Sequence, residues 1–119
     1  AYLHGHTYRL EITVSADQLD RLGMVIEIDD LRAVVKKVLL EQWDHATLLW
    51  SEDPLAPAIE AVQSEAPEKV VRLPGNPTAE VLAREAWEII ARGLPSGLRL
   101  ERLVIGESLS CRAELTRAR

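Results

Sequence analysis

The sequence is poor in cysteine and in long apolar runs, and each shortage excludes a class of protein. Its single cysteine, Cys111, cannot form an internal disulfide, which fits a reducing compartment and leaves one thiol for chemistry. No uninterrupted apolar run approaches the ~18 residues that a membrane-spanning helix requires. No basic leader with an apolar segment precedes the first motif, so we expect a soluble cytoplasmic protein with no membrane partner.

Positive charge is also in the minority. The 119 residues include 14 Lys and Arg against 19 Asp and Glu, which gives a net charge of -5. Nucleic-acid-binding proteins usually present a concentrated basic face to phosphates, so we expect no nucleic-acid partner. Any anionic substrate must therefore be met by local positive charge.

The pattern of apolar residues predicts one α+β domain over residues 1–119. Apolar side chains alternate with polar ones in residues 8–14, as in a half-buried strand, and recur with helical spacing in residues 31–39. We expect helices packed on one face of an antiparallel sheet. The predicted strands are 6–14, 24–28, 69–73, 98–105 and 111–115, and the predicted helices are 30–43, 55–62 and 78–92.

Capping residues fix the expected ends of the two longer helices. Asp29 or Asp30 suits the N-cap of the first helix, and Pro77 or Thr78 suits the start of the second. Gly93 is expected to close the second helix. The proline-rich stretch between the two helices is expected to be the least regular third of the chain.

Two of the three histidines stand at the head of the first predicted strand, in the stretch LHGH. Side chains two residues apart on a strand point to the same side, so His4 and His6 can bind one metal ion. The alternative is a pair of partly buried histidines that cap a strand. A zinc site also requires a third protein ligand, and the spacing leaves both His45 and Cys111 open as candidates.

An acid and an imidazole, Asp44 and His45, stand together at the end of the first predicted helix. They could act as a proton relay if the chain leaves helical geometry here, because adjacent residues do not face each other on a helix. The alternative is a solvated helix end with His45 stabilised by the helix dipole. Glu107 follows an apolar strand and carries almost no signal alone, and Cys111 stands where a small buried thiol is usual.

Five blocks of the sequence, taken together in order and spacing, resemble the 6-pyruvoyl-tetrahydropterin synthase family. The blocks are LHGHTYRLEITV, GMVIEIDDLRAVVKKV, WDHATLL, NPTAEVLAREAWE and VIGES. Within the family, the likeness is greatest to the bacterial and archaeal branch that includes 6-carboxytetrahydropterin synthase. The resemblance implies a tunnelling fold, in which ββααββ subunits join their sheets into a barrel, as a homohexamer of two trimers with active sites between subunits.

The same resemblance implies a zinc-dependent reaction. The implied substrate is 7,8-dihydroneopterin triphosphate, and the implied products are 6-carboxytetrahydropterin, acetaldehyde and triphosphate, on the route to queuosine and related deazapurines. Two alternatives stay open. One is a 6-pyruvoyl-tetrahydropterin synthase, which eliminates triphosphate without cleaving a carbon–carbon bond, and the other is a pterin-binding protein of this fold without turnover.

Carried over residue by residue, the resemblance gives each candidate a role. His4 and His6 match two of three zinc ligands, and Asp44 and His45 match the acid/base pair, which removes His45 from the metal candidates. Glu107 matches the carboxylate that anchors the pterin by accepting two hydrogen bonds from the ring.

Further family elements lie in the loop before the second helix and upstream of the chain. Pro77 and Thr78 match a loop that contacts the pterin from the neighbouring subunit. The third zinc histidine and the catalytic cysteine would stand before Ala1, so we expect the chain to lack the first strand of a longer protein, rather than to be a variant that lost these groups. Cys111 does not replace that cysteine, because it matches an ordinary residue of the last strand.

Overall fold

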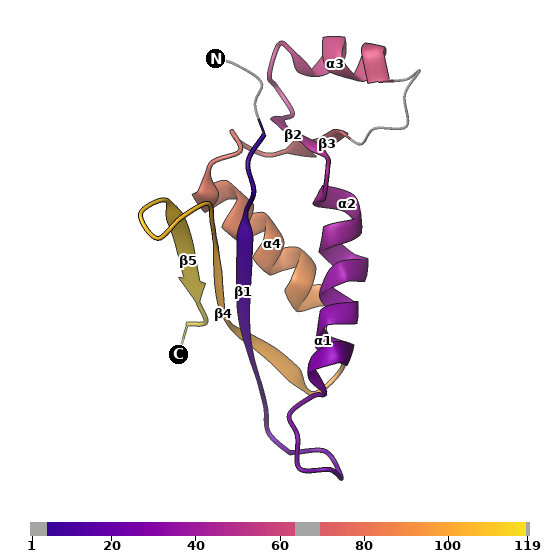
Figure 1. Ribbon diagram of the computed structural model, residues 1–119, viewed down its shortest axis with the longest axis vertical. Helices are drawn as coiled ribbons and strands as arrows, with labels where there is room; N and C mark the ends of the chain where they lie inside the picture. The colour runs from indigo at the N-terminus through magenta and orange to yellow at the C-terminus, as the bar shows by residue number, and fades with distance from the viewer. Residues whose placement is uncertain (1–4, 64–69, 119) are drawn as a thin grey trace.

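The computed structural model describes residues 5–63 and 70–118, and an antiparallel sheet of three strands is its central element (Figure 1). The strands are β1 (Arg9–Ala16), β4 (Leu98–Gly106) and β5 (Arg112–Thr116), in the order β1-β4-β5. β1 pairs with β4 from Arg9 opposite Gly106 to Ala16 opposite Leu98, with a register shift between Thr13 and Val14. The antiparallel sheet and three of the predicted strands are therefore confirmed.

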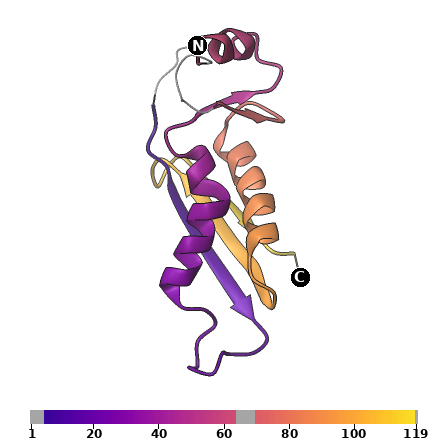
Figure 2. The same ribbon diagram turned by 90° about the vertical axis from the view of Figure 1, so that its right-hand side faces the viewer.

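Two helical segments cover one face of this sheet (Figure 2). The first runs through α1 (Ile28–Val35), a π-helical turn η1 (Lys36–Leu40) and α2 (Glu41–Trp43), and the second is α4 (Ala79–Gly93). α4 packs on β4 and β5 and also contacts α1 and η1. Gly93 permits the close contact with η1, because a Cβ atom there would lie 2.7 Å from Cγ1 of Val38. Both predicted helices are confirmed.

The core lies between these helices and the sheet. In α4, Leu82, Ala86 and Ile90 follow one another four residues apart on the buried face, as the apolar periodicity predicts. The complete set of buried residues in this cluster is Val35, Leu39, Leu73, Leu82, Ala83, Ala86, Ile90, Leu100, Leu103 and Ile105.

A small β–α–β unit lies between the two long helices in the chain and above them in Figure 1. Its strands β2 (Thr47–Trp50) and β3 (Val70–Leu73) pair in parallel, and α3 (Ala56–Gln63) lies between them in sequence. A parallel pair of strands needs such a crossover connection. The stretch is rich in proline and polar residues, so its sequence pattern does not predict the connection. The predicted helix 55–62 and strand 69–73 are confirmed except for residue 69, which lies outside the described residues, whereas β2 was not predicted.

The predicted strand at residues 24–28 is wrong, because a side chain holds this stretch in a loop. The Asp20 carboxylate accepts hydrogen bonds from the backbone N–H groups of Leu22 (2.9 Å) and Met24 (3.0 Å). Its own N–H donates to the Met24 carbonyl at 2.7 Å, and Gly23 adopts a φ of 83°. Side-chain acceptors of this kind compete with sheet pairing.

The start of α1 also differs from the expectation. Glu27 is the N-cap, and its carboxylate accepts from the Asp30 N–H at 3.2 Å. The helix therefore begins at Ile28, a few residues before the predicted Asp29 or Asp30 caps would start it. The described elements thus run β1, the long helix, β2–α3–β3, α4, β4 and β5, and not as two strands, two helices and two strands.

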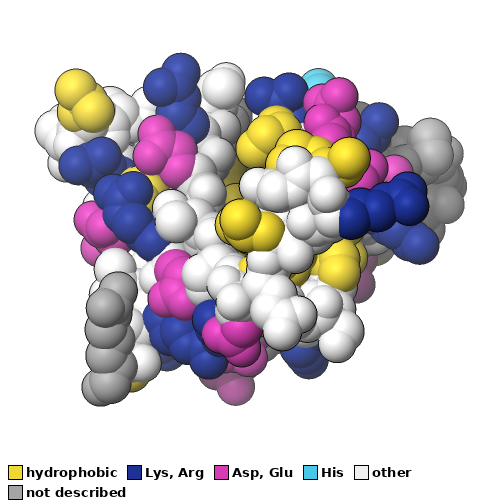
Figure 3. All heavy atoms as spheres, turned by 90° about the horizontal axis from the view of Figure 1, so that it is seen from below, with side chains coloured by type: hydrophobic (Ala, Val, Ile, Leu, Met, Phe, Trp, Pro, Cys, Tyr) yellow, Lys and Arg dark blue, Asp and Glu magenta, His cyan; other side chains and the backbone are white. Residues whose placement is uncertain are grey.

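The loop between β1 and α1 exposes the apolar side chains of Leu19, Leu22 and Val25, and the first residue of α1, Ile28, is exposed beside them. Figure 3 views the molecule from this end, where hydrophobic patches are interspersed with lysine, arginine and carboxylate side chains.

In residues 5–63 and 70–118, no helix has the length and apolar character needed to cross a membrane.

Candidate active site

A pocket of about 420 Å³ opens where β1 begins and β4 ends. Three segments that are distant in sequence line it: the approach to β1, the start of α4, and the turn from β4 to β5. Its lining includes His6, Tyr8, Pro77, Thr78, Glu107 and Cys111. The structure therefore brings one predicted zinc ligand together with the predicted pterin-contacting residues.

The centre of the pocket is a contact between His6 and Glu107. The imidazole Nδ1 lies 2.9 Å from Oε2 of Glu107, and the two side chains are 32% and 34% exposed. The antiparallel register explains the contact, because Arg9 pairs with Gly106, so the residues before Arg9 lie beside those after Gly106.

Tyr8 lines the pocket together with His6 and Glu107 and was missed as a functional residue. Its ring lies 5.9 Å from the His6 ring at an interplanar angle of 53°. Burial, followed by the negative charge of Glu107, raises the pKa of Tyr8, so the phenol keeps its proton at neutral pH. In the alternating strand pattern, Tyr8 counts only as one more apolar side chain. Its hydroxyl, two residues from His6, was the available signal that it belongs to the site.

The start of α4 forms another wall of the pocket. Thr78 is the N-cap, and its hydroxyl accepts a hydrogen bond from the Val81 N–H at 3.2 Å, as predicted. Pro77 stands immediately before it, and Ala79 and Glu80 of the first turn also line the pocket. This capping fixes the direction in which the helix leaves the pocket.

Arg112 is the one lysine or arginine among the described residues that line this pocket, which also contains the carboxylates of Glu80 and Glu107. It supplies the local positive charge that an anionic substrate requires in a protein of net negative charge.

Asp44 and His45 form a pair of their own. Nδ1 of His45 lies 3.1 Å from Oδ1 of Asp44, because Asp44 has an extended backbone (ψ 129°) and His45 adopts a φ of 56°. The chain thus leaves helical geometry here. The His45 side chain is 92% exposed and the Asp44 side chain is 70% exposed. Within the described part of the chain, neither residue lines the pocket. Their segment, between α2 and β2, lies at the same end of the molecule as the pocket (Figure 1).

Only one of the two predicted zinc ligands, His6, is among the described residues. His4 lies outside the described residues, and residues 5–63 and 70–118 contain no group of three histidine, cysteine or carboxylate side chains that could hold a metal ion. The chemistry of His6 nevertheless fits a zinc ligand, because ligating histidines commonly have a carboxylate beside their second ring nitrogen, and Oε2 of Glu107 lies 2.9 Å from Nδ1.

Cys111 is exposed, so the expectation of a small buried thiol is wrong. The residue stands in the turn before β5, not inside the strand, and its side chain lines the pocket.

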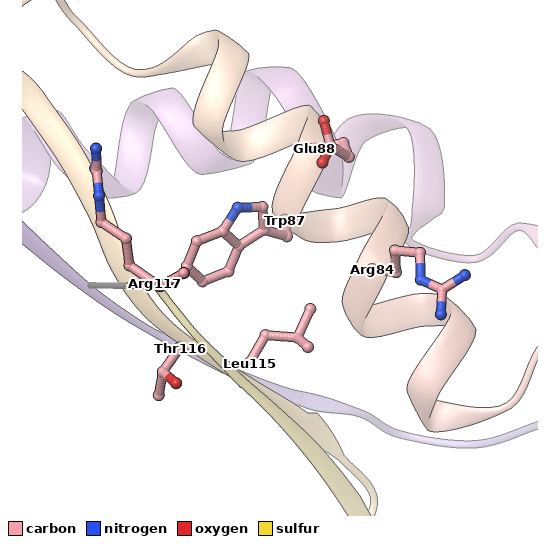
Figure 4. A pocket seen from close by; sticks show the side chains of 7 residues that line it. Arg84, Trp87, Glu88, Leu115, Thr116 and Arg117 are labelled. Atoms are coloured by element: carbon pink, nitrogen blue, oxygen red, sulfur yellow. The ribbon is translucent and has the colours of Figure 1, made fainter.

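A second pocket, of about 370 Å³, lies between α4 and the end of β5. In Figure 4, Trp87 and Leu115 extend into the space between helix and strand, and Arg84, Glu88 and Arg117 surround them. None of the predicted site residues that the structure describes lines this pocket.

Comparison with known proteins decides the family. A sequence profile of the 6-pyruvoyl tetrahydropterin synthase family matches residues 1–118. The chain belongs to this family. The 6-carboxy-5,6,7,8-tetrahydropterin synthase of Aquifex aeolicus is 30% identical over 118 residues, which cover 94% of the chain and 72% of that relative.

A further relative and one solved structure are similar to the chain. The 6-carboxy-5,6,7,8-tetrahydropterin synthase of Rickettsia felis is 37% identical over 82 residues, or 69% of the chain and 58% of that relative. The chain thus spans little more than half the length of this relative. An uncharacterized protein from Wolinella succinogenes has a solved structure with a TM-score of 0.78 over 98% of the chain and 80% of its own, and its 22% identity supports the fold alone.

Proposed function

We propose that the protein converts 7,8-dihydroneopterin triphosphate to 6-carboxy-5,6,7,8-tetrahydropterin, with loss of acetaldehyde and triphosphate. The observation that carries the proposal is the pocket that His6, Thr78 and Glu107 line together from three separate segments. The relatives from Aquifex aeolicus and Rickettsia felis are both named 6-carboxy-5,6,7,8-tetrahydropterin synthase, which supports this choice of reaction within the family.

Glu107 orients the pterin in this proposal. A carboxylate has about four acceptor positions, and Nδ1 of His6 lies 2.9 Å from one of the two oxygens of Glu107. The remaining positions suit the amide and amino groups on the edge of the ring, so the contact fixes the substrate without taking part in the chemistry.

His6, together with His4 and a third ligand, would hold zinc at one side of the pocket. A bound zinc ion acts as a Lewis acid, which acidifies the C–H and O–H groups of the substrate side chain. The Glu107 carboxylate would keep the His6 ring in the tautomer whose other nitrogen faces the metal.

Asp44 and His45 would move protons to and from the side chain. An imidazole can both accept and donate a proton, and Oδ1 of Asp44 lies 3.1 Å from Nδ1 of His45. The pair is exposed and stands outside the pocket of its own chain, so we propose that it acts at an active site between subunits of a homo-oligomer, a hexamer of two trimers.

The proposed setting is the cytoplasm, which the single cysteine supports.

Product analysis of the full-length protein tests the reaction and separates the three candidate functions. Release of acetaldehyde with 6-carboxytetrahydropterin supports the proposal. Triphosphate elimination to a pyruvoyl product without acetaldehyde would replace it with 6-pyruvoyl-tetrahydropterin synthase activity, and pterin binding without turnover would indicate a binding protein.

A further inference from the structure

Two arginines flank a glycine at the end of the sheet where the pocket opens. Gly106 of β4 pairs with Arg9 of β1 on one side and with Arg112 of β5 on the other. Residues directly opposite each other on paired strands project to the same face of a sheet, so the two arginine side chains share one face. Their neighbours Leu10 and Ala113 pack against the core, so the arginines lie on the face that the long helices leave uncovered (Figure 2).

The glycine keeps the space between the two arginines open. A Cβ atom on Gly106 would lie 2.3 Å from Cβ of Arg112, so no side chain can stand there without a shift of the hairpin. Arg9 and Arg112 are two strand spacings apart, or about 9–10 Å. Both residues are exposed, and both long side chains can reach over the glycine toward one ligand.

The positive charge of the two arginines is not neutralised by an ion pair. The next carboxylates on the same face are Glu11 and Glu114, and Arg102 contacts Glu114 and lies 3.9 Å from Glu11. Among the residues that the structure describes, Arg9 and Arg112 form no ion pair. Two guanidinium groups without a carboxylate partner therefore stand together in a protein of net negative charge.

This surface is continuous with the pocket. Arg112 lines the pocket together with Glu107, the residue that follows Gly106 in the chain. A guanidinium group keeps its charge at neutral pH and donates paired hydrogen bonds to phosphate oxygens. A chain of phosphates is long enough to reach both arginines at once, whereas a single phosphate meets one of them.

We propose that Arg9 and Arg112 form a binding site for a triphosphate anion. The inference rests on the proposed function only for the source of this anion, which is the triphosphate group of the substrate or the free triphosphate that the reaction releases. Either source presents the same phosphate oxygens to the two arginines.

Isothermal titration calorimetry of the full-length protein with inorganic triphosphate tests the site without any pterin. We expect Arg9→Gln and Arg112→Gln each to raise the Kd about tenfold, and the double variant to raise it about 100-fold, because hydrogen bonds between charged groups are lost. Arg21→Gln is the matched control, since it removes the same charge from an exposed residue in the loop after β1, at the other end of that strand.

The control variant should keep the wild-type Kd, and urea unfolding should show that all variants are as stable as the wild type. An equal Kd in the wild type and the double variant would overturn the inference. So would a wild type that binds no inorganic triphosphate, or a control variant that loses as much affinity as Arg112→Gln.

Steady-state kinetics of the double variant identifies the source of the anion. A raised KM for dihydroneopterin triphosphate, with an unchanged Kd for unphosphorylated neopterin, supports the site and assigns it to the substrate. An unchanged KM, with loss of inhibition by inorganic triphosphate, supports the site and assigns it to the released anion.

Failure of this inference is distinguishable from failure of the proposed function. A wild-type protein that binds inorganic triphosphate through the two arginines, but does not convert dihydroneopterin triphosphate, contradicts the proposed function alone. A wild-type protein that converts the substrate, while the double variant has the same KM and the same Kd for triphosphate, contradicts the arginine site alone.

Discussion

Glu107 is the residue at which the contacts of the pocket converge, so its removal should separate ligand binding from metal binding. We expect Glu107→Ala to weaken neopterin binding by about 100-fold, because two hydrogen bonds to a charged group are lost together. Zinc content, measured on the same preparation, should be retained. Equal loss of zinc and neopterin affinity would show that Glu107 serves the metal site and not the pterin.

His45 should affect turnover without affecting the metal. Loss of a general acid or base lowers kcat by about 10²- to 10⁴-fold, which steady-state assays of His45→Asn would detect. Asparagine is the matched replacement, because it tolerates the positive φ of 56° at this position better than most residues. Loss of zinc in this variant would return His45 to the metal ligands that its spacing first allowed.

The roles of single residues were predictable only where a local pattern carries them. The Thr78 cap follows from the residues around it and is confirmed. Glu107 had no local signal, because its place beside His6 depends on pairing between β1 and β4, which are distant in the chain. The zinc role of His4 and His6 stays a prediction, and so do the catalytic roles of Asp44 and His45.

Among the elements, the β4–β5 hairpin depends on a glycine at its end. Gly106 pairs with Arg112, and a Cβ atom on Gly106 would lie 2.3 Å from Cβ of Arg112 and 2.5 Å from the Cys111 carbonyl oxygen. We therefore expect Gly106→Ala to lower the free energy of unfolding by about 1–3 kcal/mol, as overpacking does. Urea denaturation measures this, with Gly5→Ala as the control in open space. Equal stability of the two variants would contradict the close approach.

Ion pairs between β1, β4 and β5 make a contribution to the free energy of unfolding that depends on pH. Arg102 contacts Glu114 on β5 and lies 3.9 Å from Glu11 on β1, and its hydrogen bond, followed by its charge, lowers the pKa of Glu114. A lowered pKa stabilises the fold above the ordinary glutamate value of about 4.3, and the contribution is lost as the pH falls through the folded value.

The stability difference between the wild type and Glu114→Gln should therefore be present at pH 7 and vanish at strongly acidic pH. Urea unfolding curves at a series of pH values give this difference directly. A difference that is independent of pH would show that the Arg102 pair contributes nothing to the folded state.

Elements with long periodic patterns were predictable, whereas two short stretches, residues 24–28 and β2, were not. The long helix and α4 carry apolar stripes over several turns, and β1 alternates over its whole length. The stretch 24–28 is too short to identify by pattern, and the Asp20 carboxylate decides its conformation. β2 escaped prediction because its partner β3 lies beyond α3 in the chain.

For the molecule as a whole, the proposed function requires more than one subunit. The outer edge of β1 pairs with no strand among the described residues, and folded proteins avoid long exposed edges. The pocket and the Asp44–His45 pair lie at the same end of the molecule without sharing a cavity. An assembly that places the pair of one subunit at the pocket of another would complete the site, as the proposed function requires.

Zinc-dependent cleavage of the substrate side chain is the central claim, and acetaldehyde release by the full-length protein tests it most directly. The metal-stripped protein and the same protein reloaded with zinc should be incubated with 7,8-dihydroneopterin triphosphate. We predict acetaldehyde in equal amount to 6-carboxytetrahydropterin from the zinc-loaded protein, and neither product from the stripped protein. Absence of acetaldehyde from the zinc-loaded protein, or equal release without zinc, would contradict the account.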